Sequence, residues 1–548
     1  MAAVAPAAKY PGARGGAMTT TTASVSAAPR SDAPIEDRLY DIVVVGGGIN
    51  GVGIARDAAG RKLATLLLEK HDLAGATSSA SSKLIHGGLR YLEQSEFRLV
   101  RESLKEREVL WAAAPHAVQP LRFVLPVRQG MRPAWMLRTG LFLYDHIGER
   151  KRLAPTRTLR RGRDSALDPL HESIRLAFEY SDCWVDDARM VVLNAIDAQE
   201  RGAHISVGWA LTQARREEHT WRVETEGPGG ERVSVRARAL VNAAGPWVED
   251  VLGRTGTRSR SALRLIKGSH FVVPRLYPGP HAYTFQGADG RVIFTIPYER
   301  NFTLIGTTDV PYDADPAQVK ISTDEIRYLC DVLAQYLRKS VSPEQAIWEY
   351  SGVRPLYDDG GFSASTVTRD YVFDLDAPAD GAPVLSVFGG KLTTYRKLAE
   401  HALGELLPKL GIASSAWTRA AVLPGGDIPD MDIGKFTAEQ QSRYAFAEPD
   451  MIHRMCRAYG TRIERVLGSA RNRADLGTPF SAQFYEAELE YLQNAEWARC
   501  AQDVLWRRSK LGLTAAPSVI EAINRWFSQR SRSARPPRAP GAPHDANP

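Results

Sequence analysis

The stretch "YDIVVVGGGINGVGIARDAAGRKLATLLLEK" (residues 40–70) decides the fold. Its apolar run at 42–45 predicts a buried strand, the glycines after the run predict a turn, and the rest predicts a helix and a second strand. Gly46, Gly48 and Gly51 form the pattern G-x-G-x-x-G where strand meets helix. Such glycines permit a tight turn, close approach of a diphosphate to the backbone, and close packing of helix on strand. The stretch therefore predicts a Rossmann-like α/β unit that binds a dinucleotide.

The helix and the second strand also contribute polar side chains to this site. The diphosphate is expected at the N-terminus of the helix, where backbone N–H groups point at the ligand and Asn50 stands. Glu69 ends the second strand, where an acidic side chain can accept hydrogen bonds from the ribose hydroxyls. We therefore add Asn50 and Glu69 to the three glycines as candidate cofactor-binding residues.

Two further turns favour FAD over NAD as the dinucleotide. "ARALVNAAGPW" (237–247) ends a strand in small residues, and "SVFGGKLTTYRKLAEHAL" (386–403) runs from a strand through two glycines into a helix. The N-terminus of that helix could stabilise negative charge on a reduced flavin ring. The alternative is that the turns at 46–51, 237–247 and 386–403 are ordinary strand–helix turns. That alternative is acceptable for any one of the three turns but poor for all three together. The candidates here are Ala244, Gly245, Trp247 (which also suits plain packing), Gly389, Gly390, Lys391, Leu392 and Thr393.

The segment "ATSSASSKLIHGGLRYLE" (76–93) follows the second strand and so begins at the carboxyl edge of the predicted sheet, where ligands of open α/β sheets lie. Its hydroxyls can donate hydrogen bonds to phosphate oxygens, and its glycines would let the backbone pass beneath a flat ring. The alternative is a flexible, serine-rich loop. Arg90 and Tyr91 are candidates for substrate binding, because arginine binds phosphate in a bidentate manner. The candidate cofactor residues are Thr77, Ser78, Ser79, Ser81, Ser82, Lys83, Leu84, His86, Gly87 and Gly88.

The composition is that of an ordinary globular protein. The chain has 548 residues, of which 44% are hydrophobic and 24% charged, with a formal net charge of +7. This excess suits an anionic substrate or membrane surface, or simply a solvated basic face. The four cysteines are far apart and form no C-x-x-C, which predicts reduced, mostly buried thiols and no thiolate metal site. No apolar stretch is long enough to span a bilayer, so we expect a protein that is soluble or attached to a membrane from one side.

The pattern of apolar residues along the chain predicts several domains. Strand-like segments recur at 204–226, 232–242, 264–274 and 291–308, and helical periodicity takes over after Tyr395. We expect disordered tails at both ends; the acid-poor N-terminal tail leaves a mitochondrial transit peptide as an alternative. The predicted divisions are a tail at 1–36, a discontinuous FAD-binding domain at 37–115, 180–262 and 350–400, a β-sheet substrate-binding domain at 116–179 and 263–349, a helical C-terminal domain at 401–530, and a basic tail at 531–548.

Eight ordered segments resemble one family, the FAD-dependent glycerol-3-phosphate dehydrogenases of aerobic respiration. They are "GGGINGVGIARDAAGR", "ATSSASSKLIHGGLRYLE", "FEYSDCWVDDAR", "RLIKGSHFVVPR", "LIGTTDV", "YSGVRPL", "TRDY" and "VFGGKLTTYRKLAEHAL". The resemblance runs from about residue 39 to 425 and continues more weakly through "DVLWRRSKLGL" (503–513). It implies a Rossmann-like FAD domain of the glutathione-reductase or D-amino-acid-oxidase type, an interleaved β-sheet substrate domain and a helical C-terminal cap.

The resemblance also implies a reaction. Oxidation of sn-glycerol 3-phosphate to dihydroxyacetone phosphate would pass a hydride to FAD and the electrons to ubiquinone. Arg354 and Lys391 would bind the phosphate together with Arg90, and Tyr91 and Thr307 would donate hydrogen bonds to substrate oxygens. Imidazole suits the general base, because its unperturbed pKa lies near ~6.5.

Two histidines compete for the role of base. His270 is our choice because its segment matches the family's active-site strand, and His86 is the alternative. A hydrogen-bonded packing role is the simpler interpretation of either histidine alone. Asp186 and Asp187 resemble a catalytic pair, but we expect them to cap a helix or form salt bridges, since no neighbouring motif requires two carboxylates.

A quinone acceptor would require contact with a membrane, because quinones are soluble in lipid. The resemblance implies a peripheral protein on the cytoplasmic face of the inner membrane and a homodimer, with no nucleic-acid partner and no metal. The segment "NRWFSQRSRSARPPR" (524–538) could dock on anionic lipids through Trp526, Phe527 and the arginines Arg525, Arg530, Arg532, Arg535 and Arg538. Three alternatives to this dehydrogenase stay open: a glycerol-3-phosphate oxidase that uses dioxygen, an amino-acid oxidase of the same fold, and a non-catalytic flavin-binding protein.

Overall fold

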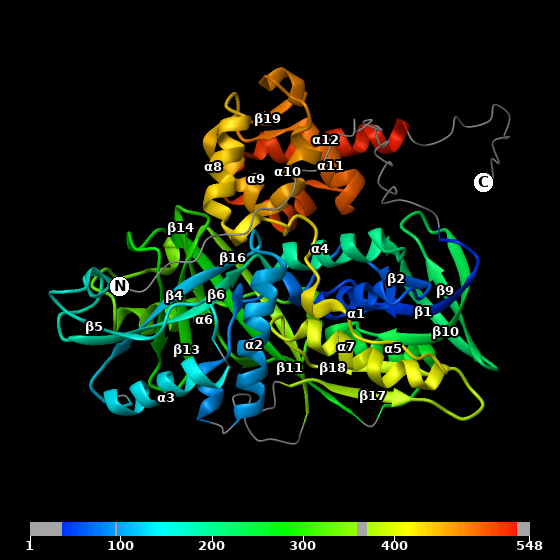
Figure 1. Cartoon of the computed structure of the whole chain (residues 1–548), viewed down its shortest axis with the longest axis horizontal. Coiled ribbons are helices and arrows are strands. Elements are labelled where there is room, and N and C mark those ends of the chain that lie inside the picture. Colours follow the sequence, from blue (N-terminus) through cyan, green and yellow to red (C-terminus); the bar gives the residue numbers. More distant parts are fainter. Residues whose placement is uncertain are drawn as a thin grey trace, which may run out of the picture.

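A computed structural model describes residues 35–93, 96–130, 132–148, 150–259, 261–358 and 370–533, without the side chains of Arg90 and 531–533. The predicted tail at 1–36 therefore lies almost wholly outside the described residues, as does nearly all of the tail at 531–548. The described chain contains two large sheets and a layer of C-terminal helices, which lies at the top of Figure 1.

The first sheet contains the two strands of the stretch at 40–70. Its strands run in the order β18-β10-β1-β2-β7, and all neighbours in this series are parallel. Antiparallel strands extend it: β17 pairs with β18, and β9 pairs with β10 and β8. The bounds are β1 Leu39–Val45, β2 Thr65–Glu69, β7 His204–Val207, β8 Ala210–Glu217, β9 Thr220–Glu226, β10 Arg232–Asn242, β17 Val372–Asp376 and β18 Val384–Phe388.

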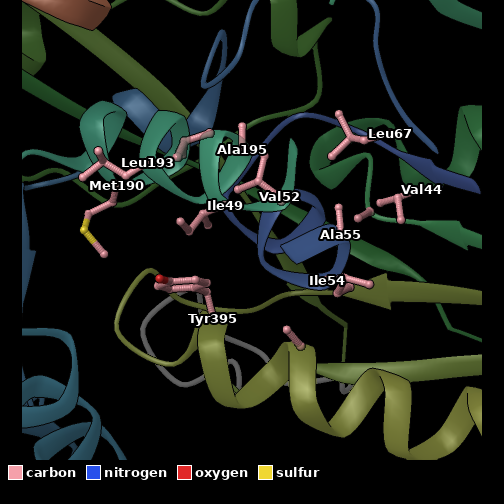
Figure 2. Packing of buried hydrophobic residues seen from close by; sticks show 14 of the residues in the cluster. Val44, Ile49, Val52, Ile54, Ala55, Leu67, Met190, Leu193, Ala195 and Tyr395 are labelled. Carbon is pink, nitrogen blue, oxygen red and sulfur yellow. The ribbon is translucent and has the colours of Figure 1, made fainter. Parts of the chain in front are cut away.

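Both faces of this sheet are covered, which explains why β1 reads as a continuous apolar run. Ile42 and Val44 belong to one buried cluster with residues of three helices, α1 (Ile49–Gly60), α4 (Asp187–Glu200) and α7 (Tyr395–Leu406), and Figure 2 shows Val44 beside Ala55 of α1. Val43 and Val45 face the other way, toward β8, β9 and helix α5 (Val248–Thr255). The glycine turn thus stands at the edge of a sheet that is fixed from both sides.

The second sheet has ten strands and carries His270 on β11 and Arg354 on β16. Its order is β15-β11-β14-β13-β12-β4-β6-β3, with β16 added to β11 and β5 to β6. The strands are β3 Leu84–Ile85, β4 Val118–Val127, β5 Arg157–Arg160, β6 Leu176–Val185, β11 Leu263–Pro274, β12 Ala282–Gln286, β13 Val292–Tyr298, β14 Phe302–Gly306, β15 Val310–Pro311 and β16 Trp348–Tyr357. The helices in this part of the chain are α2 Phe97–Ala113, α3 Ala134–Ile147 and α6 Thr323–Ala334.

The sheet memberships differ from the predicted divisions at two places. The segments 180–262 and 350–400, assigned above to FAD binding, begin inside β6 and β16, which belong to the second sheet. Strand pairing over long sequence distances decides this membership. The full lengths of β6 and β16 were therefore not readable from local periodicity.

The C-terminal helices enclose a core of their own. They are α8 Ile433–Arg443, α9 Pro449–Tyr459, α10 Ile463–Leu467, α11 Glu486–Glu496 and α12 Pro517–Ser533, with a π-helix at Asp503–Arg508 and the short strands β19 Pro479–Ser481 and β20 Phe484–Tyr485. Trp526 and Phe527 are buried in this core, and the Trp526 indole donates a hydrogen bond to Glu486 (2.8 Å). The expectation that these two aromatic residues contact lipid is therefore wrong, because α12 turns them inward.

Two other expectations concern the whole chain. The four thiols are free; Cys183, Cys330 and Cys456 are buried and Cys500 is half-buried, as predicted. Of the helices in the described ranges, none combines the length and apolarity that crossing a bilayer requires.

Candidate active site

The glycine turn has the geometry that a diphosphate needs. Gly46 has a φ of +114°, and a Cβ there would lie 2.5 Å from the Ala243 oxygen. A Cβ at Gly51 would lie 1.9 Å from the Gly46 oxygen, so only glycine lets α1 pack this closely on β1. At the N-terminus of α1, the Ile49 N–H donates to the Ser78 hydroxyl (3.0 Å). Ser78, a candidate for cofactor binding, thus lies beside the N-terminus of α1.

Glu69 faces the same turn from the end of β2. Its carboxylate accepts hydrogen bonds from the N–H groups of Gly47 and His71, both at 2.7 Å. Burial raises the pKa of Glu69, although these two hydrogen bonds oppose the rise. The carboxylate borders the cavity described next and can accept a ribose hydroxyl there.

A cavity of about 740 Å³ runs along this edge of the first sheet. The three predicted turns line it, from Gly46 and Gly48 through Ala244, Gly245 and Trp247 to Gly389 and Gly390. Sites for cofactors and other small molecules have volumes of ~300–1,000 Å³. Within the described residues the buried Oδ1 atom of Asn50 has no hydrogen-bond partner, and Asn50 borders the cavity. The volume, the glycine cradle, the helix terminus and this amide oxygen all fit a dinucleotide.

Part of the serine-rich segment is bound to the protein itself. Ser81 donates to Asp187 Oδ2 (2.7 Å), and the fully buried Lys83 donates to Asp187 Oδ1 (2.8 Å). Asp186 caps α4 by accepting from the Arg189 N–H, and it also binds Lys510. The expected structural roles of Asp186 and Asp187 are thereby confirmed. Ser81 and Lys83 border the cofactor cavity, but their polar atoms hold the start of α4 in place.

A second cavity, of about 320 Å³, adjoins the first and holds the candidate catalytic residues. Thr77, Ser81, Gly352, Gly390 and Leu392 border both cavities. The second cavity is called the substrate pocket below. Its lining includes His86, Tyr91, His270, Thr307, Arg354 and Lys391, which are brought together from five separate segments.

His270 stands on β11 and is only 2% exposed. Its Nε2 atom lies 2.9 Å from the Ser82 hydroxyl, and its ring stacks on Tyr350 with centroids 4.9 Å apart. Nδ1 has no hydrogen-bond partner among the described residues. Burial, followed by the positive charges of Arg354 and Lys83, holds the pKa of His270 well below its ordinary value. The imidazole is therefore neutral at pH 7.

The cationic groups lie on another wall of the pocket. Arg354, on β16, donates to the Thr307 hydroxyl (3.0 Å) and forms a close ion pair with Asp309. A Cβ at Gly268 would lie 2.5 Å from the Arg354 guanidinium, so this glycine makes room for it. The Lys391 ammonium lies 4.1 Å from the ring centroid of Tyr91. These groups offer fixed donors and positive charge to an anionic substrate.

The remaining predicted residues occupy different surroundings. His86 is half-buried, and its N–H lies 3.4 Å from the Thr393 hydroxyl. Gly88 has a φ of +75°, and a Cβ there would lie 2.2 Å from the Tyr91 ring. The two glycines of this segment therefore make room for neighbouring side chains of the protein. The side chain of Arg90 lies outside the described residues.

A buried polar network behind the pocket was not found from the sequence. Asp182 accepts hydrogen bonds from Arg107 (2.5 Å) and from the Tyr144 hydroxyl (2.8 Å), and Tyr144 in turn accepts from the Gly87 N–H (2.7 Å). Asp182 also borders the pocket, and burial, ahead of the opposing effect of Arg107, raises its pKa. The one sequence signal for this network is Asp182 in "EYSDCW" (179–184), an acidic residue within a strand-like segment.

Comparisons with known proteins agree with this geometry. A family model described as FAD-dependent oxidoreductase matches residues 41–396, and one described as the C-terminal domain of α-glycerophosphate oxidase matches 416–530. The chain is 52% identical to a glycerol-3-phosphate dehydrogenase of Pseudomonas aeruginosa, over 90% of this chain and 96% of that protein. It is 50% identical to the aerobic glycerol-3-phosphate dehydrogenase of Escherichia coli, over 89% and 97%. A D-erythritol 1-phosphate dehydrogenase of Brucella abortus is 49% identical, over 90% and 98%.

A solved structure is similar over nearly the whole chain. It is the glycerol-3-phosphate dehydrogenase of Bacillus halodurans complexed with FAD, with a TM-score of 0.71 and 26% identity over 90% of this chain and 91% of that one. The family match and the fold establish the cofactor as FAD. The chain belongs to the FAD-dependent oxidoreductase family, within the group that includes the glycerol-3-phosphate dehydrogenases.

Proposed function

We propose that this protein oxidises sn-glycerol 3-phosphate to dihydroxyacetone phosphate and passes the electrons through FAD to ubiquinone. The observation that carries the proposal is the substrate pocket, where a neutral histidine and two cationic side chains adjoin the FAD cavity. The identity of 50–52% with named glycerol-3-phosphate dehydrogenases supports the same substrate.

Phosphate recognition falls to Arg354 and Lys391. A guanidinium presents parallel N–H donors that match two phosphate oxygens, and an ammonium adds a point charge. Thr307 already accepts a hydrogen bond from Arg354, which orients the guanidinium within the pocket. Tyr91, beside Lys391, places a phenol at the same wall. Arg90 is proposed as a third cation on the strength of its motif.

His270 is proposed as the general base. FAD, when bound, accepts the hydride from the carbinol carbon. The alcohol proton goes to the neutral imidazole, and the C–O bond becomes a carbonyl. Ser82 and the stacked Tyr350 fix the ring plane, which a base needs for a well-aligned proton transfer. His86, which borders the same pocket, remains the alternative base.

A four-carbon polyol phosphate is the second candidate substrate. The Brucella abortus relative, named for D-erythritol 1-phosphate, is nearly as similar to this chain as the glycerol-3-phosphate dehydrogenases. Thr284 and Gln286 also line the pocket and offer polar groups for further substrate hydroxyls.

The substrates can be separated by comparing kcat/KM with an artificial electron acceptor. We expect kcat/KM for sn-glycerol 3-phosphate to be higher than kcat/KM for D-erythritol 1-phosphate or for unphosphorylated glycerol. A higher value for the erythritol phosphate would transfer the assignment to the four-carbon substrate. Equal values with and without phosphate would contradict the roles of Arg354 and Lys391. Ubiquinone analogues and dioxygen, supplied in turn, distinguish a dehydrogenase from an oxidase.

An exposed apolar surface on α3 supports the proposal that the protein attaches to a membrane, where a quinone acceptor would be found. Trp135 is 71% exposed and Phe142 60% exposed, and Met136 and Leu143 lie beside them on the same helix. Exposed apolar groups of this size mark interaction surfaces. Leu137 of α3 also borders the substrate pocket, so the same helix contributes to the pocket and to this surface. In Figure 1, α3 lies at the side of the molecule opposite the C-terminal helices.

Sedimentation with phosphatidylcholine–phosphatidylglycerol vesicles tests this surface. The double variant Trp135→Ser/Phe142→Ser should no longer sediment with the vesicles. Ile520 is an exposed apolar residue of α12, and Ile520→Ser should sediment like the wild type. Deletion of 534–548 measures what the basic tail adds. Unchanged sedimentation of the double variant would remove α3 from the proposal.

A further inference from the structure

The FAD cavity has one wall that comes from the C-terminal helices. Residues 502–510, called the strap below, include the π-helix Asp503–Arg508. Gln502, Trp506, Arg507 and Lys510 line the cavity beside the glycine turns. The FAD-dependent oxidoreductase model ends at residue 396, so the strap lies outside the part of the chain that it describes.

A buried ion-pair cluster fastens the strap to the end of β2. Asp72, only 4% exposed, accepts two hydrogen bonds from Arg508 (both 2.8 Å) and one from Arg507 (2.5 Å). Burial alone would raise the pKa of Asp72, but the two guanidinium groups hold it below its ordinary value. Asp72 follows Glu69 closely in sequence, so the strap lies at the side of the cavity where β2 ends.

Aromatic and ionic contacts fasten the rest of the strap. Trp506 stacks on Trp348 with ring centroids 4.5 Å apart, and Trp348 contacts Tyr350 at 4.9 Å. Tyr350 is the residue that stacks on His270. The Lys510 ammonium lies 3.1 Å from Asp186 at the start of α4. The strap thus contacts β16, which carries Arg354, and the start of α4, which Asp186 caps.

We propose that the strap is part of the FAD site, and that docking of the C-terminal helices and binding of FAD stabilise each other. FAD carries an anionic diphosphate, and Arg507 and Lys510 add cationic groups to the same cavity that the helix N-terminus borders. FAD that touches the strap favours the docked position of the strap. By reciprocity, a strap held in that position binds FAD more tightly.

The first test measures the release of FAD from the diluted holoenzyme by the rise in flavin fluorescence. Coupling between sites typically changes affinity ~5- to 150-fold, so Trp506→Leu and Arg507→Gln should each release FAD at least about 5-fold faster. Arg443→Gln, in an exposed ion pair with Glu464 on the same helical domain, is the matched control and should release FAD at the wild-type rate. Wild-type rates in both strap variants would overturn the proposal.

Hydrogen exchange of the unmutated protein gives a test that needs no variant. Amides at 497–513 should exchange at least about 5-fold more slowly in the holoenzyme than after FAD has been dialysed away, because coupling works in both directions. Amides of α8, which is remote from the cavity, should change little. Equal exchange of 497–513 with and without FAD would overturn the proposal, even if the strap variants fail to fold.

Discussion

The two adjoining cavities are built on different principles. The lining of the FAD cavity includes three glycine-containing turns, each lying at the carboxyl end of a strand in one parallel series of the first sheet. The substrate pocket is lined by side chains that stand at positions 86, 270, 307, 354 and 391 and meet only in the folded chain. Single substitutions should therefore affect catalysis in the second cavity while FAD remains in the first.

Among the substitutions, removal of His270 should have the largest effect on the rate of flavin reduction. A general base contributes ~10²–10⁴-fold to a rate, so His270→Ala should slow flavin reduction by about that factor. The FAD content should remain that of the wild type, since His270 borders the substrate pocket and is not among the residues lining the FAD cavity. Stopped-flow reduction and the flavin-to-protein absorbance ratio measure the two quantities.

A matched control separates the loss of a base from the loss of any buried histidine. His281→Asn alters another histidine of low exposure that does not border the pocket. It should reduce flavin at the wild-type rate. A loss of FAD from His270→Ala, or an unchanged rate, would contradict the division between the cavities.

Breaking the Lys83–Asp187 ion pair should affect stability more than chemistry. Both side chains are at most 1% exposed, and removal of one partner of a buried pair costs ~3–5 kcal/mol. Asp187→Asn should therefore lower the free energy of unfolding by about that amount in urea. Asp450→Asn, whose ion pair with Arg300 is exposed, should cost much less. Equal costs for the two variants would contradict the greater contribution of the buried pair to stability.

Arg354→Lys should weaken substrate binding by an intermediate amount. Lysine keeps the charge but loses the fork of donors, and a hydrogen bond to a charged group is worth ~1.5–3 kcal/mol, or roughly 10- to 150-fold in KM. Arg327→Lys, on the exposed side of α6, serves as the control and should leave KM unchanged. An unchanged KM in Arg354→Lys would mean that Arg354 binds Asp309 and Thr307 but not the substrate.

Acidification should produce the smallest and most gradual effect. Burial, followed by the charges of Arg189 and Arg462, lowers the pKa of His116 to about 3. Between pH ~6.5 and that value the unfolded chain binds a proton that the folded chain does not, so stability falls as the pH falls, by ~1.4 kcal/mol per pH unit. His116→Asn should show a shallower fall in urea unfolding between pH 6.5 and 5. Parallel slopes would contradict the low pKa.

The same contrast explains how much of the molecule could be predicted from the sequence. The first sheet was predicted well, because its strands at 204–226 and 232–242 and its opening unit carry local periodicity and glycine spacing. The second sheet was predicted as strands at 264–274 and 291–308, but its membership depends on pairings such as that of β11 with β16. Long-range pairing leaves no local pattern, so the divisions at 180 and 350 were misplaced relative to the strands.

The exposed surface of α3 and the strap at 502–510 were not predicted from the sequence, because both depend on tertiary contacts. Helix α3 buries Leu141 and Tyr144 but exposes Trp135 and Phe142, so it has large apolar side chains on both sides, and the sequence alone does not tell the exposed ones from the buried ones. The strap depends on the contact of Arg508 with Asp72, whose partners are far apart in sequence. Resemblance identified the segment 503–513 without indicating what it contacts.

The most direct measurement is an anaerobic spectrum of the purified wild-type protein before and after addition of sn-glycerol 3-phosphate. The account predicts that the oxidised-flavin band is lost in wild type, is lost much more slowly in His270→Ala, and needs far more substrate to be lost in Arg354→Lys. A wild-type flavin that the substrate leaves oxidised, although FAD is bound, would contradict the assignment of the pocket.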